Sequence, residues 1–452
     1  MNDKEIREGM SKLVKSVKET IDNEKAKGTI QSEFMPVTQW KVTDFKYDDN
    51  GINAPRSGIN IIKPTWRSSS IQIFQIIKIK DEYTHLSNIL EQTPKVAERE
   101  ILLNSFITRI ILSYLDKAEL SDTEISTQID NFISELKDER VKSEATALLV
   151  GLILHPDEIE IAHGIKLRKP KKEDFEIESP IYDFHRYNPI PDPTAFLNIS
   201  IQTNSTISIQ DEVTKMIAIL RLFKCGSVKF TEFKMHSYII SGTLGSGDIS
   251  PPQEKYIIKN DDVDYLKKFY KNVSPILPLI FYRLDTGRED HLSIAYNRYS
   301  DALLQSGIIE RRITNAIMGL EALYFKPSGE QQELIYRLSI RVAKVLGNFS
   351  FDPLKIRSTL KDAYVVRSIF SHGGHLDYTK KKKFNEKYDG DINNLLIKIL
   401  DILRISIIIS MTIRSEKDEF IDVIDHALID PSSNQQLIGI LNPAKNILKS
   451  AS

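Results

Sequence analysis

The residues Lys361-Asp-Ala-Tyr-Val-Val-Arg-Ser-Ile-Phe-Ser-His-Gly-Gly-His375 mark a helix and its end, and they give the helical pattern of the C-terminal part of this chain a fixed position. The glycine pair Gly373-Gly374 predicts that a helix ends just after His372, because glycine readily takes the left-handed conformation found at helix ends. The same helix is expected to begin at Pro353, since Asp352 can cap the first N–H groups and proline suits the first helical position. A helix over 353–371 is therefore the reference point for what lies on either side.

Apolar residues recur at helical spacing on both sides of this helix. Gly347 is expected to close the helix before it. The pattern predicts further helices over 292–305, 308–325, 329–346, 392–412 and 418–429. We therefore expect residues 286–452 to form an all-α domain.

The first 285 residues show a mixed pattern. Helical spacing covers the first 25 residues, whereas 40–66 is rich in Asn, Asp, Gly and Pro and is expected to be irregular. A strand is predicted at 70–79, followed by helices at 96–117, 121–139 and 143–154, with Ser121 and Glu124 forming a capping box. Prolines between 170 and 193 indicate a linker, after which we expect a strand at 195–202, a helix at 209–223 and a strand at 228–240. The predicted fold class is α+β multidomain, with a mixed region at 1–169, an α+β segment at 170–285 and the helical domain at 286–452.

Composition places limits on the function. The chain has 452 residues, a formal net charge of −1 and a single cysteine, Cys225, which excludes an internal disulfide and a cysteine-based zinc site. The charged start of the sequence does not resemble a secretory signal, and the most apolar stretch, 402–413, is too short to span a membrane. A cytoplasmic protein without metal or other cofactor is expected. Residues 291–452 carry +4 and residues 1–290 carry −5, which sum to −1, so a polyanion should prefer the C-terminal part.

Arg367 and His372 are candidate catalytic residues at the end of the 353–371 helix. The unsatisfied carbonyls there favour a charged imidazole, and the guanidinium has a planar fork that suits phosphate oxygens. Metal-free cleavage of a phosphodiester needs a group that moves protons and a cation that stabilises charge on the phosphate. On spacing alone, the alternative is structural: an arginine paired with a carboxylate and a histidine that caps carbonyls.

Three sequence blocks, at 317–325, 336–347 and 364–374, resemble the Apea-like HEPN family. They contain a Leu-Glu-Ala-Leu-Tyr helix, an Arg-x-Ala-x-x-Leu-Gly helix and a Tyr-x-x-Arg-Ser-x-x-x-His-Gly helix end. The resemblance covers about 296–413. It implies an all-α HEPN bundle that forms a homodimer or higher homo-oligomer, in which two Arg-x4-His motifs face one another and cut RNA without metal.

The resemblance also implies roles for individual residues. Arg367 and His372 would be the catalytic pair, Ser368 the polar residue beside the arginine, Glu321 the glutamate of the Leu-Glu-Ala-Leu-Tyr helix, and Tyr364 the tyrosine of the third block. Residues 1–285 would then be a sensor for an activating trigger, as in prokaryotic anti-phage, abortive-infection or stress effectors. The alternative is a catalytically inactive HEPN module that dimerises or binds RNA or protein.

A basic cluster follows the motif in what is expected to be a polar connector. Clustered lysines supply sequence-independent affinity for phosphates, so the cluster is a candidate RNA-binding site. A solvated loop without a partner is the other interpretation. Tyr378 and Tyr388 flank the cluster and are candidates for base stacking. The cluster consists of Lys380, Lys381, Lys382, Lys383 and Lys387.

Overall fold

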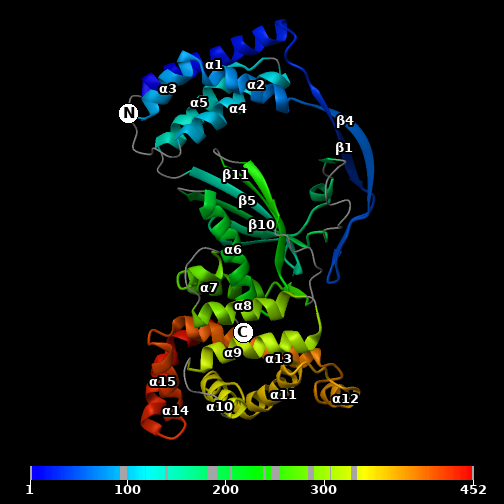
Figure 1. Cartoon of the computed structure of the whole chain (residues 1–452), viewed down its shortest axis with the longest axis vertical. Coiled ribbons are helices and arrows are strands. Elements are labelled where there is room, and N and C mark those ends of the chain that lie inside the picture. Colours follow the sequence, from blue (N-terminus) through cyan, green and yellow to red (C-terminus); the bar gives the residue numbers. More distant parts are fainter. Residues whose placement is uncertain are drawn as a thin grey trace.

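The chain is arranged as three tiers along its longest axis in the computed structural model (Figure 1). Helices α1 to α5 form one end, a sheet covered by α6 lies in the middle, and helices α8 to α15 form the other end. The structure describes residues 3–91, 99–117, 119–137, 141–176, 178–180, 191–203, 206–237, 241–245, 254–283, 290–305, 307–326 and 333–449. The predicted boundary between residues 285 and 286 lies outside these ranges.

The N-terminal tier has a hydrophobic core of its own, built by residues between Ile6 and Ile133. Its helices are α1 (Asp3–Ala26), α2 (Arg67–Lys78), α3 (Asp81–Glu91), α4 (Arg99–Lys117) and α5 (Asp122–Lys137). The predicted helices at the N-terminus, 96–117 and 121–139 are confirmed over the described residues, while 96–98 and 138–139 lie outside them. The capping box is confirmed as well, because the backbone N–H of Ser121 donates to Glu124 and that of Glu124 donates to the Ser121 hydroxyl. The predicted strand at 70–79 is wrong: Ile73 and Ile77 are both buried, four residues apart, as a helix requires.

A long antiparallel ribbon leaves this tier and runs beside the middle one (Figure 1). It pairs β1 (Glu33–Val42) with β4 (Arg56–Thr65), and the short strands β2 (Lys46–Asp48) and β3 (Gly51–Asn53) lie at its turn. The prediction of an irregular segment at 40–66 is therefore wrong. Nearly all of β4 is exposed on both faces, so its sequence lacks the apolar alternation that identifies a strand.

The middle tier is a six-stranded antiparallel sheet in the order β12-β11-β5-β10-β8-β7. The helix predicted at 143–154 is wrong, because most of this segment forms the central strand β5. Ala145, Ala147 and Leu149 are buried at every second position and therefore face one side of the sheet. The predicted strands at 195–202 and 228–240 are β10 and β11, although residues 238–240 lie outside the described residues. Strands from both sides of residue 170 share this sheet. Their bounds are β5 (Val141–Val150), β7 (Glu158–Ala162), β8 (Ile165–Arg168), β10 (Ala195–Thr203), β11 (Lys229–Ser237) and β12 (Ser241–Gly245).

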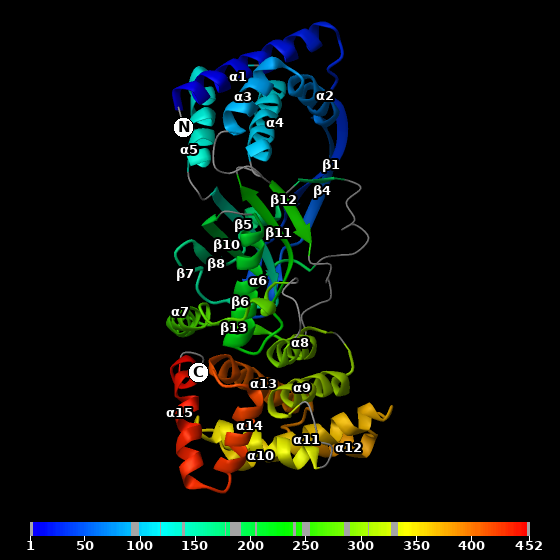
Figure 2. The ribbon, with the colours of Figure 1, turned by 60° about the vertical axis from the view of Figure 1, so that its left-hand side comes forward.

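Smaller elements complete the middle tier. The proline-rich stretch includes a 3-10 turn (Lys172–Phe175) and β9 (Glu178–Pro180), which pairs with β1. Two short strands, β6 (Leu152–Leu154) and β13 (Tyr256–Ile258), pair in parallel, and α7 (Asp262–Val273) follows them. Helix α6 (Thr206–Phe223) lies on the sheet and points toward the third tier, as Figure 2 shows. One hydrophobic core runs from the sheet through α6 into the C-terminal helices.

Every described secondary-structure element from His291 onward is a helix, as predicted. The chain as a whole contains both helices and sheets. Gly319 of α9 lies at a three-helix crossing, where an added Cβ would come within 2.8 Å of Leu403 in α13 and 3.3 Å of the Ala295 carbonyl in α8. The helices are α8 (His291–Leu304), α9 (Ile309–Tyr324), α10 (Leu334–Gly347), α11 (Pro353–Ser371), α12 (Tyr378–Lys387), α13 (Asn393–Thr412), α14 (Lys417–Ala427) and α15 (Pro431–Leu448).

Two expectations about these helices need correction. Gly347 is not a left-handed residue after α10 but its last helical residue, and the left-handed turn falls at Ser350. The lysine-rich segment expected to be a connector is helix α12, and α15 was not predicted. Residues 329–332, the start of the helix predicted at 329–346, lie outside the described residues.

Within the described ranges, no helix is both long enough and apolar enough to cross a membrane.

Candidate active site

Helix α11 carries the Arg-x4-His motif and has the predicted start and end. The Asp352 carboxylate accepts hydrogen bonds from the backbone N–H groups of Leu354 and Lys355. At the other end, Gly373 has φ +78° and donates to the Phe370 carbonyl, while Gly374 donates to the Ile369 carbonyl. This pair of bonds is a Schellman motif, which fixes where α11 stops and places His372 at the C-cap.

Arg367 is held on one side by α9 and by its own helix. Its Nη2 donates to Glu321 Oε2 at 3.2 Å, and Nη1 lies 3.5 Å from the Tyr364 hydroxyl, at the limit of a hydrogen bond. The guanidinium carbon also lies 5.1 Å from the centre of the Tyr364 ring, within cation–π range. The structure thus brings together three of the predicted site residues, Glu321, Tyr364 and Arg367.

These contacts leave hydrogen-bonding capacity unused. Within the described part of the chain, Arg367 Nε and Glu321 Oε1 are buried and have no hydrogen-bond partner. The two side chains are still 26% and 16% exposed, so solvent or a ligand can reach part of the pair. Buried Nε cannot meet a ligand in this arrangement, but Nη1 and Nη2 each make only one long contact and retain donors that a phosphate could accept.

Burial controls the electrostatics of Glu321 and Tyr364. Loss of water raises the pKa of Glu321, although the positive charge of Arg367 opposes this effect. Burial likewise raises the pKa of the Tyr364 phenol, which therefore stays a neutral hydrogen-bonding group near neutral pH. The two effects on the Glu321 pKa therefore oppose each other: burial makes ionisation less favourable than for an exposed glutamate, and Arg367 makes it more favourable.

His372 is exposed at the end of α11. Within the described residues its ring has no hydrogen bond or ion pair, and its backbone N–H donates to the Ser368 carbonyl at 3.3 Å. Side chains five residues apart on a helix diverge by about 140° and are offset by roughly 7.5 Å along the axis. Arg367 and His372 of one chain are therefore poorly placed to act on the same phosphate.

The lysine cluster lies on α12, which extends beside the end of α11 and has no buried residue (Figure 2). Lys380, Lys381, Lys382 and Lys383 are all exposed. Lys387 differs from them, because its ammonium forms a 2.5 Å ion pair with Asp362 of α11 and also contacts Ser358.

The two flanking tyrosines also differ. Tyr378 is 83% exposed, whereas Tyr388 is buried and donates to Asp362 at 2.5 Å, so the expectation that Tyr388 stacks on a base is wrong. Lys387 and Tyr388 thus share one carboxylate and attach α12 to α11. The sequence does not reveal this anchor, because Asp362 lies 25 residues from Lys387 and no local pattern links the two.

Other features lie away from the motif. Two cavities formed by described residues of the bundle are lined by residues other than Arg367 and His372. Within the described ranges, no three His, Cys, Asp or Glu side chains converge on a point where they could hold a metal ion. Comparison with protein-family models, with curated proteins and with solved structures found no match to this chain.

Proposed function

We propose that this chain is a metal-independent endoribonuclease of the HEPN type, with Arg367 and His372 as its catalytic residues. The observation that carries the proposal is the state of Arg367: Glu321 and Tyr364 hold one side of the guanidinium through single long contacts, and the side chain is still 26% exposed. This arrangement orients a permanent cation at an accessible helix end without using all its donors, as recognition of a phosphate requires.

The chemistry follows from the two side chains. Neutral His372 accepts the proton of the RNA 2′-hydroxyl, and the 2′-oxygen then attacks the adjacent phosphorus. The bond to the 5′-oxygen breaks, a protonated imidazole returns a proton to that oxygen, and the products are a 2′,3′-cyclic phosphate and a 5′-hydroxyl. Arg367 donates to the non-bridging oxygens as negative charge builds on them.

A homodimer is part of this proposal. One imidazole cannot be the base at the 2′-oxygen and the acid at the 5′-oxygen at the same moment, and Arg367 and His372 diverge within one chain. Two copies with their α11 ends facing each other would supply two histidines and two arginines to one phosphate. Mixing wild type with His372→Ala should lower activity more steeply than dilution does, whereas full cleavage by a monomer at micromolar concentration would contradict the composite site.

The central experiment is cleavage of end-labelled RNA in excess EDTA. We expect fragments that end in 2′,3′-cyclic phosphate, and we expect His372→Ala to lose at least about 100-fold in rate. His375→Ala is a matched control, because His375 is exposed three residues further along the same chain segment. Equal loss in both histidine variants, or full activity in His372→Ala, would contradict the assignment.

The Arg367–Glu321 ion pair also favours a second candidate, a bundle that dimerises or binds RNA or protein without cutting it. In that case the pair simply joins α11 to α9. The same assay separates the two: RNA would remain intact while a gel-shift or sedimentation experiment still detected the complex.

A further inference from the structure

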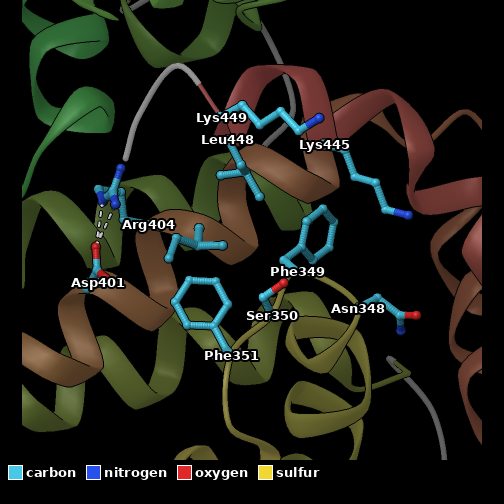
Figure 3. Close-up of a pocket in the computed structure, with 10 residues that line it drawn as sticks. Asn348, Phe349, Ser350, Phe351, Asp401, Arg404, Lys445, Leu448 and Lys449 are labelled. Atoms are coloured by element: carbon cyan, nitrogen blue, oxygen red, sulfur yellow. Dashed lines mark hydrogen bonds and ion pairs between the residues drawn. The ribbon is translucent and has the colours of Figure 1, made fainter.

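A cavity of about 610 Å³ lies in the bundle between the loop that joins α10 to α11, helix α13 and the last turns of α15 (Figure 3). This volume lies within the range of small-molecule sites. Its lining combines two aromatic rings, Phe349 and Phe351, with two lysines, Lys445 and Lys449. The cavity is separate from the Arg-x4-His motif, which contributes no lining residue.

Lys445 lies in the last turn of α15, and Lys449, four residues later, is the C-cap of that helix. Within the described residues, neither ammonium has an ion-pair partner, and such i, i+4 pairs of like charge destabilise a helix. The three basic and one acidic side chains that line the cavity, Lys445, Lys449, Arg404 and Asp401, give it a formal charge of +2. The partial negative charge at the C-terminal end of α15 favours these two cations. An anion bound between the lysines would in addition remove their mutual repulsion.

Arg404 does not belong to this anion site. Its Nη2 lies 2.6 Å from Asp401 Oδ1, and its Nη1 donates to the carbonyls of Leu222 and Phe223 at the end of α6. Figure 3 shows the guanidinium turned toward Asp401 and away from the lysines. Arg404 therefore joins α6 to α13 and forms a wall of the cavity, and the free positive charge comes from Lys445 and Lys449.

The loop on the opposite wall supplies flat apolar surfaces. Phe351 is 37% exposed, and Phe349 is half-buried against the core. Between them Ser350 has φ +69°, a left-handed conformation that a residue with a Cβ adopts at an energetic cost. The strained residue places two phenylalanines on one cavity, where an aromatic ligand could stack on them.

We propose that this cavity binds a nucleoside monophosphate. Its base would stack on Phe349 and Phe351, and its phosphate would bind Lys445 and Lys449. A nucleoside monophosphate would contact both the aromatic and the basic part of the lining, whereas a free anion would contact only the basic part. This site goes beyond the proposed ribonuclease activity and does not depend on it, because it involves neither Arg367 nor His372.

The test is isothermal titration of the full chain with AMP, with adenosine and with inorganic phosphate. We expect AMP to bind with a dissociation constant on the order of 10 to 100 μM and each half alone to bind at least about tenfold more weakly. Absence of AMP binding at several millimolar would overturn the proposal, and phosphate binding as tightly as AMP would overturn its aromatic half.

Two variants locate the site. Lys445→Gln/Lys449→Gln should weaken AMP at least about tenfold, and Phe351→Ala should weaken it about fivefold or more. The matched control is Lys12→Gln/Lys15→Gln, which removes two exposed lysines from α1 at the other end of the molecule. AMP binding that is unchanged in the Lys445/Lys449 variant, or lowered equally in the control, would place the ligand elsewhere and overturn the proposal.

Discussion

Two arginine–carboxylate pairs hold helices of the bundle together, and they differ in how completely the arginine is used. Arg341 of α10 contacts Asp425 of α14 through Nε at 2.7 Å and Nη2 at 2.6 Å, and its Nη1 donates to the Tyr324 carbonyl. Arg367 of α11 contacts Glu321 of α9 through Nη2 alone, at 3.2 Å. The Arg341 side chain is 3% exposed and that of Arg367 is 26% exposed.

The difference separates an arginine that serves the fold from one that can serve a ligand. Paired, parallel N–H···O bonds at short distance leave few donors of Arg341 for anything else. Arg367 makes a single, longer contact with Glu321, and a quarter of its side chain is exposed. The number of donors already occupied is thus a better guide to function than the presence of an ion pair.

Substitution by alanine at both positions should separate activity from stability, and the largest effect is expected on activity. Arg367→Ala should lower RNA cleavage by about 10²- to 10³-fold, as for loss of a group that stabilises transition-state charge. Arg341→Ala, assayed at a temperature where it is folded, should retain a rate within a few-fold of wild type. Single-turnover cleavage with circular dichroism as a folding control tests this. Equal losses in the two variants would remove the distinction between the pairs.

Stability should respond in the opposite order. Arg341→Ala should lower the free energy of unfolding by about 3 kcal/mol, because it leaves a carboxylate and the buried Tyr324 carbonyl without their donor. Arg367→Ala should cost about 1 kcal/mol, since Glu321 can respond by holding its proton. Urea denaturation followed by circular dichroism measures both. A larger loss in Arg367→Ala would favour the purely structural interpretation of the motif.

The sequence predicted helix α11 well, because its start and end depend on local contacts. Asp352, Pro353 and Gly373 each act within a few residues of their own position. The segment at 70–79 and β5 were assigned wrongly because short apolar runs fit either period, and only tertiary burial shows which period applies. The β1–β4 ribbon gave no signal, since exposed strands need no alternation.

For the site, the motif residues were predicted by their resemblance to a family pattern, but their partners were not uniformly predictable. Glu321 could be predicted because it belongs to the family pattern. The link from Asp362 to Lys387 and Tyr388 could not, because it depends on how α12 packs on α11. The unused Nε of Arg367 is likewise invisible in the sequence, because it depends on the angle at which α9 meets α11.

The Arg367–Glu321 pair should also make stability depend on pH. Because the pKa of Glu321 is raised above its ordinary value of 4.5 in the folded chain, the folded state holds more protons than the unfolded state at pH values between the unfolded and folded pKa. The stabilising contribution is complete below that value and is lost as the pH rises through the folded pKa. Glu321→Gln cannot titrate, so the stability of wild type relative to this variant should fall as the pH rises from about 4 toward neutrality.

Urea midpoints measured at a series of pH values in low salt provide the test. Glu419→Gln, an exposed position on α14, controls for the loss of one carboxyl group. The effect should be smaller than that of Arg341→Ala, since Arg367 opposes the influence of burial. Parallel pH curves for wild type and Glu321→Gln would mean that Glu321 is as freely ionised as a surface carboxylate, and the contrast between the two pairs would lose its electrostatic basis.

The smallest expected effect concerns the lysines of α12. They show the same contrast between a cation that holds two helices together and cations that remain available to a ligand. Lys387 is used, because its 2.5 Å contact with Asp362 attaches α12 to α11, whereas Lys381 and Lys383 have no ion pair within the described chain. Lys380 and Lys382 contact Asp377 and Glu386 only as exposed pairs, which contribute little.

If the exposed lysines contact the RNA backbone, changing Lys380, Lys381, Lys382 and Lys383 to Gln should weaken binding of single-stranded RNA for all sequences alike. Each lost phosphate contact should reduce the slope of log affinity against log salt by about 0.7. Lys387→Gln should leave that slope unchanged and should instead lower stability slightly, by less than about 1 kcal/mol. The cleavage rate at saturating RNA should change little in both variants, because these lysines position the substrate and do not touch the reacting atoms. Filter binding from 50 to 300 mM salt checks the slopes. A slope that falls only in Lys387→Gln would reverse the assignment, since the cation committed to the fold would then be the one that meets the phosphate.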